Sequence, residues 1–221
     1  MPETVRFNIV NPAIEDYVTG LVPARSPVLS RVEEHAAQHN VPIVGPLEGQ
    51  ALALLARLVK AKSILEVGTA TGYSAIWLGQ VAKENAGHLT GIEFDASRHA
   101  EATKNLADAG LADTVEVLSG DARDVVAGLT GPYDFIFFDL VRSIPDEHHL
   151  LRLYELCADR LVTGGLFCVD NVLHGGDVLD PKTQGARSAQ HLNQTIGRDG
   201  RFVASFLTIR DGLAVALKVR E

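Results

Sequence analysis

The stretch Ile64–Leu78, ILEVGTATGYSAIWL, decides the fold of this chain. It contains most of a short apolar run, Ser63–Val67, which predicts a β-strand. Its second half begins a helix-length stretch, which predicts a helix over Tyr73–Asn85. Gly68 and Gly72 lie between the two, where they allow a tight turn and a close approach of backbone to a ligand. The spacing is not Gly-x-Gly-x-x-Gly, so a dinucleotide pyrophosphate site is disfavoured.

Strand and helix patterns alternate after this unit, and a helix pattern precedes it. We expect further strands at His88–Glu93, Val115–Leu118, Phe135–Asp139 and Leu166–Asp170, and further helices at Leu47–Val59, Ser97–Ala109, Arg123–Leu129 and Glu147–Arg160. Short strands separated by helices indicate right-handed crossovers and a parallel sheet. Two final runs, Phe202–Ile209 and Leu213–Lys218, flank an Asp-Gly turn and predict an antiparallel hairpin. The expected fold is α/β, with a seven-stranded, mostly parallel sheet and an antiparallel edge.

The first 45 residues differ from the rest of the chain. Ala13–Thr19 and Pro27–His39 predict two short helices, and Pro42, Gly45 and Pro46 then interrupt the chain. We therefore expect an N-terminal helical extension over residues 1–45, followed by one α/β domain over residues 46–221.

Composition and charge exclude several classes of protein. With 221 residues, of which 46% are hydrophobic, the chain can bury a full core and is not a disordered polypeptide. A formal net charge of −8 counts against a protein whose main partner is nucleic acid. Cys157 and Cys168 lie in apolar settings, which predicts buried free thiols and a reducing compartment. The sequence shows neither a signal-peptide pattern nor an apolar run of roughly 18 residues, so we expect a cytoplasmic protein outside the membrane.

Acidic residues stand at or near the carboxyl ends of successive predicted strands, namely Glu66, Glu93, Asp121, Asp139 and Asp170. In open α/β sheets the ligand crevice lies at these ends, so we expect the five side chains to border one site. A carboxylate at Glu93 can accept both hydroxyls of a ribose. The alternative for Glu93 is a solvent-facing helix start, although Asp95 or Ser97 suits the capping position better.

A second cluster consists of Asp139 with Asp170 and Asn171. Two carboxylates and an amide oxygen from adjacent strand ends are hard ligands that suit Mg²⁺ or Ca²⁺. No His and Cys set with zinc spacing is present in the sequence. The alternative is that Asp170 and Asn171 cap a turn while Asp139 begins a loop.

Taken together, these motifs resemble those of the cation-dependent class I O-methyltransferases of the catechol and caffeoyl-CoA type. The similarity extends from GPLEGQ at 45–50 to DGL at 211–213. ILEVGTATGYSAIWL is similar to the family's S-adenosylmethionine loop, GIEFD to its ribose-binding strand end, SGDA to its adenine-side turn and VDNVLHGG to its metal-binding turn. The resemblance implies a Rossmann-like class I methyltransferase fold with helices on both faces of the sheet. It also implies a homodimer whose N-terminal helices help to shape the substrate pocket.

The resemblance also implies which residues form the cofactor and metal sites. Those implied to contact S-adenosylmethionine are Val44, Glu66, Gly68, Thr69, Tyr73, Ser74, Glu93, Asp121, Ala122 and Asp139. Those implied to hold Mg²⁺, or another divalent cation such as Ca²⁺ or Mn²⁺, are Asp139, Asp170 and Asn171.

The chain departs from the family pattern after the first metal-binding Asp. Arg142 occupies the position of the family's usual Lys, and Pro145 that of an aromatic residue. Because Arg stays protonated, it cannot be a general base, although it could stabilise an oxyanion. His174, where the family often has an aromatic residue, could act as a base. Arg142, His174 and Asp139 are thus the catalytic candidates; the alternatives are a solvated loop charge for Arg142 and a structural role for His174.

The resulting hypothesis is divalent-metal-dependent methyl transfer to a hydroxyl of a small, vicinal dihydroxy aromatic substrate of the catechol or caffeoyl kind. The loops at Leu140–His148 and Leu173–Arg187 are expected to select the acceptor. Three other functions are weighed against it: methylation of hydroxyuridine in tRNA, cofactor binding without catalysis, and a nicotinamide-dependent dehydrogenase. The acidic charge counts against the first, and the glycine spacing counts against the last.

Overall fold

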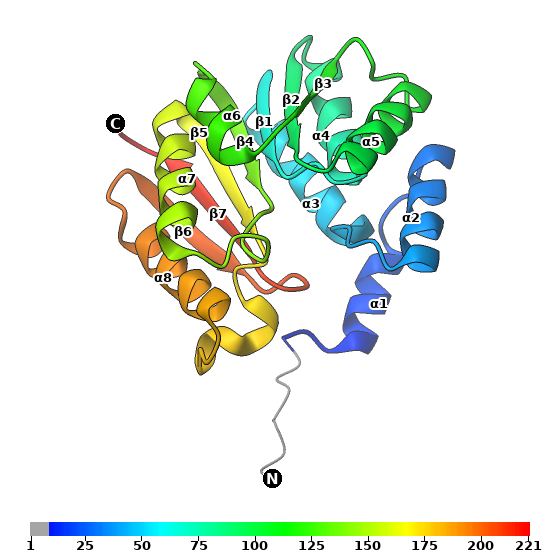
Figure 1. The fold of residues 1–221 in the computed structure, drawn as a ribbon. Helices are drawn as coiled ribbons and strands as arrows, with labels where there is room; N and C mark the ends of the chain where they lie inside the picture. The colour runs from blue at the N-terminus through cyan, green and yellow to red at the C-terminus, as the bar shows by residue number, and fades with distance from the viewer. Residues whose placement is uncertain (1–8) are drawn as a thin grey trace.

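The protein folds around a single seven-stranded sheet (Figure 1). The computed structural model describes residues 9–221, so residues 1–8 of the expected N-terminal extension lie outside the described part. The strands are β1 Ser63–Val67, β2 His88–Glu93, β3 Val115–Ser119, β4 Tyr133–Phe138, β5 Leu161–Asp170, β6 Phe202–Leu207 and β7 Leu213–Lys218. Their order across the sheet is β3-β2-β1-β4-β5-β7-β6. Strands β1 to β5 pair in parallel, and β7 pairs antiparallel with both β5 and β6, which confirms the predicted fold class.

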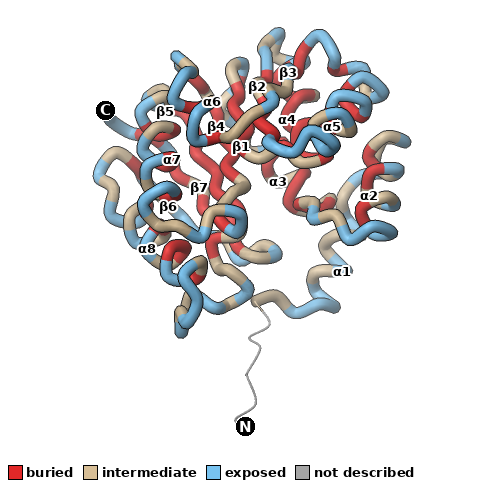
Figure 2. Tube along the Cα trace, in the orientation of Figure 1, coloured by how far each residue is buried: buried red, intermediate tan, exposed pale blue. Residues whose placement is uncertain are grey.

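Helices cover both faces of the sheet. They are α1 Pro12–Gly20, α2 Pro27–His39, α3 Gly45–Leu58, α4 Tyr73–Glu84, α5 Ala96–Asp108, α6 Ala122–Gly128, α7 Glu147–Arg160 and α8 Gln184–Arg198, with a 3-10 segment η1 at His174–Leu179. Side chains alternate between the faces along each strand. Phe135 and Phe137 of β4 therefore pack with α3 and α4, whereas Ile136 and Phe138 pack with α7 and α8. Figure 2 shows the strands as the buried centre of the molecule.

Helix α8 is the main element that the sequence patterns did not indicate. The expected loop at Leu173–Arg187 instead contains η1 and the first turn of α8. Thr183 caps α8 by accepting a hydrogen bond from the Ala186 amide at 3.1 Å. Strand β5 also begins five residues earlier than predicted, at Leu161. Gly164 and Gly165 lie within this earlier part of the strand, where the pairing with β4 is irregular.

Both cysteines are buried and free, as predicted. Burial raises the pKa of the Cys157 thiol to about 12, so this group stays protonated at neutral pH. No helix within residues 9–221 combines the length and the apolar character needed to cross a bilayer.

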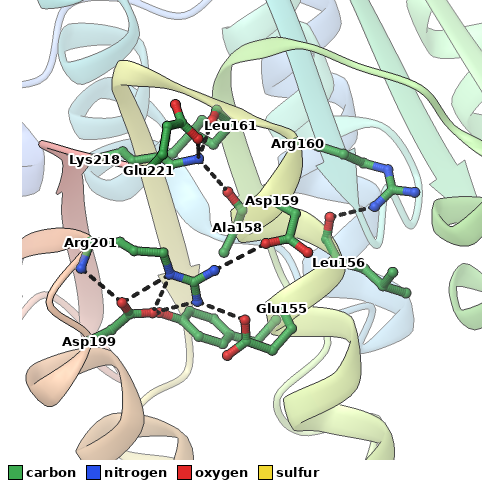
Figure 3. A network of polar contacts seen from close by, with 11 residues as sticks. Glu155, Leu156, Ala158, Asp159, Arg160, Leu161, Asp199, Arg201, Lys218 and Glu221 are labelled. Atoms are coloured by element: carbon green, nitrogen blue, oxygen red, sulfur yellow. Dashed lines mark hydrogen bonds and ion pairs between the residues drawn. The ribbon is translucent and has the colours of Figure 1, made fainter.

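An ion-pair network joins α7, α8 and β6 at the edge of the sheet where the parallel strands begin (Figure 3). Arg201 donates hydrogen bonds to Asp199 and reaches Glu155 at 2.7 Å and Asp159 at 3.1 Å. The Tyr154 hydroxyl donates to the Asp199 carboxylate at 2.7 Å. Burial opposes ionisation of Asp199, but the bonds from Arg201 and Tyr154 outweigh it and lower the pKa of Asp199 to about 2.

We expect Asp199→Asn to lower the free energy of unfolding by about 2 kcal/mol at neutral pH. The folded-state pKa of Asp199 is depressed below the unfolded value of about 3.9. Its contribution is therefore complete well above that value and is lost as the pH falls toward 2. Urea unfolding at neutral and at acidic pH measures this. The matched control is Asp159→Asn, which removes a 67% exposed carboxylate from the same Arg201 and should cost less than about 0.5 kcal/mol. Equal losses in the two variants would contradict the assignment.

Candidate active site

The candidate site lies where the strand order reverses, between β1 and β4. The Asp139 amide, directly after β4, donates to the Val67 carbonyl of β1 at 2.9 Å. Gly68 follows at φ +100°, and a Cβ there would lie 2.7 Å from the Asp139 carbonyl oxygen. Only glycine permits this approach. In an open α/β sheet such a reversal opens a crevice at the strand ends, and here it brings the glycine loop beside Asp139.

The glycine loop between β1 and α4 is held by β2 and α5. The Gly68 and Thr69 amides both donate to the Ile92 carbonyl, at 3.2 and 3.0 Å. Gly72 has φ +88°, and a Cβ on it would lie 3.2 Å from the Ala102 Cα of α5. The Thr69 side chain is buried against Gly91, so it packs beneath the loop. The loop therefore has a fixed backbone shape before any ligand binds.

Glu93, at the end of β2, organises the neighbouring turns. Its side chain is buried, and its two oxygens accept hydrogen bonds from the Ala70 and Asp95 amides, each at 2.8 Å. Each carboxylate oxygen has a second lone pair that remains available for a ligand hydroxyl. The Gly120 amide, from the turn after β3, donates to the Glu93 carbonyl at 3.0 Å. The ends of β1, β2 and β3 thus form one continuous rim.

Asp121 and Ala122 lie at the start of α6 on the same rim. Asp121 is the N-cap of that helix and accepts a hydrogen bond from the Arg123 amide at 2.9 Å. Hydrogen bonds from the Arg123 side chain, with that cap, lower the pKa of Asp121. Its side chain therefore has a capping role whatever else it binds.

Glu66 is a buried carboxylate beneath the glycine loop. Burial raises its pKa to about 7, although the hydroxyls of Ser74 and Thr69 lie close enough to lower it in part. Neither carboxylate oxygen has a hydrogen-bond partner of normal geometry within residues 9–221. A buried carboxylate without a partner is costly, so this position suits a group that accepts hydrogen bonds from a bound ligand.

Asp139 and Asp170 come together at the ends of β4 and β5, as predicted. Asp139 keeps some surface accessible to solvent, yet burial of its carboxyl group raises its pKa, and repulsion from Asp170 and Glu66 raises it further. Burial also raises the pKa of Asp170, against hydrogen bonds from Asn171. Asn171 has φ +62° and its amide donates to Asp170 Oδ1 at 2.5 Å. Two mutually repelling carboxylates beside an amide side chain are a donor set that fits a hard divalent cation.

Two residues of this cluster were missed by the sequence patterns. Glu48, in the first turn of α3, is fully buried, and its pKa is raised by burial and by Asp170 and Asp139. Arg210, in the turn between β6 and β7, lowers the pKa of all three carboxyl groups. Within residues 9–221 no three His, Cys, Asp or Glu side chains meet closely enough to form a complete metal site by themselves. The predicted set of two carboxylates and one amide thus remains the candidate ligand set.

Comparison with known proteins identifies the family. The O-methyltransferase family profile matches residues 22–219. The chain belongs to the O-methyltransferase family. It is 33% identical over 228 residues to a catechol O-methyltransferase of Niastella koreensis, covering 95% of this chain and 98% of the relative. It is 26% identical over 216 residues to a caffeoyl-CoA O-methyltransferase of Stellaria longipes, covering 91% and 87% of the two chains.

A solved structure supports the same assignment. The O-methyltransferase TomG from Streptomyces achromogenes, involved in tomaymycin synthesis and solved in complex with S-adenosylmethionine, superposes with a TM-score of 0.81. The two chains are 28% identical, and the alignment covers 100% of each. The predicted family and the Rossmann-like fold are therefore confirmed.

In this O-methyltransferase, Arg142 is part of an ion pair that ties three loops together. Its Nε donates to Asp211 Oδ2 at 2.8 Å, and its side chain remains 49% exposed. Asp211 Oδ1 accepts from the Gly175 amide at 2.5 Å. In Figure 1 the turn between β6 and β7 lies beside the segment after β5, and the Leu173 amide donates to the Asp211 carbonyl at 2.9 Å. Arg142 therefore holds together the loops around the Asp170–Asn171 turn.

His174 is enclosed within the same layer of loops. Its side chain is 15% exposed, and its Nδ1 lies 3.8 Å from Asp177 with no hydrogen-bond partner inside residues 9–221. A Cβ on Gly185 would lie 3.1 Å from the ring Nε2 and 3.9 Å from Pro145. This packing favours the structural alternative for His174, and its catalytic role stays a prediction.

The remaining predicted cofactor residues, Val44 and Tyr73, pack into the core at the edge of the site. Val44 is buried just before α3. Tyr73 begins α4, and its hydroxyl donates to Glu33 of α2 at 2.7 Å. Tyr73 thus anchors the N-terminal helices of the O-methyltransferase next to the glycine loop.

Proposed function

We propose that this O-methyltransferase uses S-adenosylmethionine and a divalent cation to methylate one hydroxyl of a vicinal dihydroxy aromatic substrate. The observation that carries the proposal is the contact between the glycine loop and Asp139 at the β1–β4 reversal. Because of that contact, the rim at the ends of β1, β2 and β3, which would bind the nucleoside, lies directly beside the carboxylates of Asp139 and Asp170. The names of the relatives, a catechol and a caffeoyl-CoA O-methyltransferase, support the same acceptor chemistry.

The cofactor half of the site is the rim formed by β1, β2 and β3. Glu93 would accept the ribose hydroxyls through its free lone pairs, while Ala70 and Asp95 keep it in place. Gly68 leaves its backbone open to the ligand, and Glu66 offers an unpartnered carboxylate beneath the loop. When bound, S-adenosylmethionine would supply an electrophilic methyl group on a sulfonium.

The acceptor half of the site is formed by Asp139, Asp170 and Asn171, which would hold the cation. When bound, a divalent cation would lower the pKa of a coordinated hydroxyl and fix two neighbouring oxygens. The protein's own contribution is orientation, because the β1–β4 contact fixes the distance between the two halves. Arg142 stays protonated and pairs with Asp211, so it removes no proton from the acceptor.

The N-terminal helices complete the proposed acceptor pocket. Helix α2 packs against α4 and α5, and Tyr73 and Glu33 link it to the glycine loop. The division at residue 45, the homodimer and the cytoplasmic location stay predictions.

The proposal is tested by a methyl-transfer assay on purified protein. Catechol, a caffeoyl ester and matched monohydroxy compounds would be incubated with S-adenosylmethionine, either with Mg²⁺ or with EDTA. We expect transfer to the diols with Mg²⁺ and a loss of at least about 100-fold with EDTA. Equal rates with chelator would exclude the metal role. Tight S-adenosylmethionine binding without turnover on any diol would favour a non-catalytic binding protein instead.

A further inference from the structure

Glu48 is a buried carboxyl group that the proposed function does not use. It lies in the first turn of α3, has no solvent-exposed surface, and neither of its oxygens has a hydrogen-bond partner of normal geometry within residues 9–221. An acidic residue in the first turn of a helix is ordinarily explained by the helix dipole. That explanation applies to exposed residues, whereas complete burial of a carboxylate requires a compensating group.

Glu48 lies near the metal half of the proposed site. Helix α3 packs against β5, the strand that ends at Asp170. Glu48 lies close enough to Cys168, two residues before Asp170, to raise the pKa of that thiol further above the effect of burial. Asp170 and Asp139 are the two carboxylates that act most strongly on Glu48. Glu48 therefore lies in the buried region beside the proposed ligands and has no surface exposed to solvent.

Arg210 is the nearby cation that acts on all three carboxyl groups. Arg210 has a backbone φ of +49°. A Cβ on Gly45 would lie 2.5 Å from the Arg210 Nη1, so the guanidinium covers the N-terminus of α3. With Glu48, Asp139 and Asp170 ionised, the three carboxylates and Arg210 carry a net charge of −2. A bound divalent cation would neutralise that charge. A metal site that consisted of the two aspartates alone would give no reason for the burial of Glu48 or for the position of Arg210.

We propose that Glu48 and Arg210 are a positioning pair of the metal centre, in which Glu48 faces Asp170 and strengthens cation binding while Arg210 weakens it. Glu48 acts through the ligand Asp170 and through its charge, not as a ligand itself. This inference rests on the proposed function, because it requires the cation site at Asp139, Asp170 and Asn171.

The test measures cation affinity without turnover. Mn²⁺ binding is followed by electron paramagnetic resonance, with saturating S-adenosylhomocysteine present, in wild type, Glu48→Gln and Arg210→Gln. At an effective dielectric constant of about 20, a charge several ångströms from a divalent ion changes its affinity by about tenfold or more. We expect Glu48→Gln to raise the Kd for Mn²⁺ about tenfold or more, and Arg210→Gln to lower it about threefold, because exposed Arg210 is better screened.

Two controls separate charge from structure. Glu84→Gln makes the same change in net charge at an exposed residue paired with Arg57, and it should leave the Kd within twofold of wild type. The single tryptophan, Trp77, lies against Gly49 beside Glu48, so its fluorescence and the S-adenosylhomocysteine affinity report whether this region keeps its fold.

The possible results are distinct. Wild type that binds Mn²⁺ with the same Kd as Glu48→Gln would overturn the inference while leaving the proposed function in place. Wild type that binds no Mn²⁺ would overturn both. If Glu48→Gln does not fold, Arg210→Gln decides, since an unchanged Kd in that variant would overturn the electrostatic role.

Discussion

Asp170→Asn is expected to reduce methyl transfer to a diol about 1,000-fold or more while making the metal-free protein more stable. The loss follows because the variant removes one of the two proposed anionic metal ligands, and a metal-stabilised transition state is worth several kcal/mol. The gain in stability follows because burial raises the pKa of Asp170, and Asp139 beside it is raised as well. An amide at 170 ends that repulsion and should add about 1 kcal/mol to the free energy of unfolding.

The pH dependence of the free energy of unfolding also predicts that the Asp170 carboxylate destabilises the metal-free protein. A carboxyl group whose folded pKa lies above its unfolded pKa of about 3.9 binds more protons in the folded state. Its contribution therefore becomes unfavourable as the pH rises through the unfolded pKa toward the folded one. Urea unfolding of wild type and Asp170→Asn between acidic and neutral pH should show the difference growing as the pH rises. A variant that is inactive and also less stable at every pH would indicate that Asp170 has only a structural role.

Most of the sheet could be predicted from sequence because its strands are short, apolar and separated by turns. The ranges of β1, β2 and β7 agree with their predictions at both ends. Helix α8 was not predicted because its sequence, QGARSAQHLNQTIGR, is largely polar. A signal was present, since the buried residues Ala186, Ala189, Leu192 and Ile196 recur at helical spacing.

The part of the candidate site that consists of local sequence motifs could be predicted from the sequence. Glu93 ends β2 and Asp139 directly follows β4, so chain order alone places them at one edge of the sheet. Glu48 could not be assigned in this way, because an acidic residue at a helix start has an ordinary explanation in the dipole. The partner of Arg142 is Asp211, 69 residues away, and no local pattern predicts that pair.

Gly68→Ala is expected to weaken S-adenosylmethionine binding about 100-fold and to destabilise the fold by about 3 kcal/mol. Alanine at φ +100° is strained, and its Cβ would lie 2.7 Å from the Asp139 carbonyl oxygen, so β1 and β4 must separate at the point where the two halves of the site meet. Gly164→Ala is the matched control, because Gly164 has φ +89° but open space around its Cβ position. It should lose only about 1 kcal/mol from backbone strain and bind cofactor as wild type does. Calorimetric titration and urea unfolding measure both quantities. If Gly68→Ala bound the cofactor with wild-type affinity, the glycine loop would not be the cofactor site, because a ligand seated there cannot be indifferent to a displaced backbone.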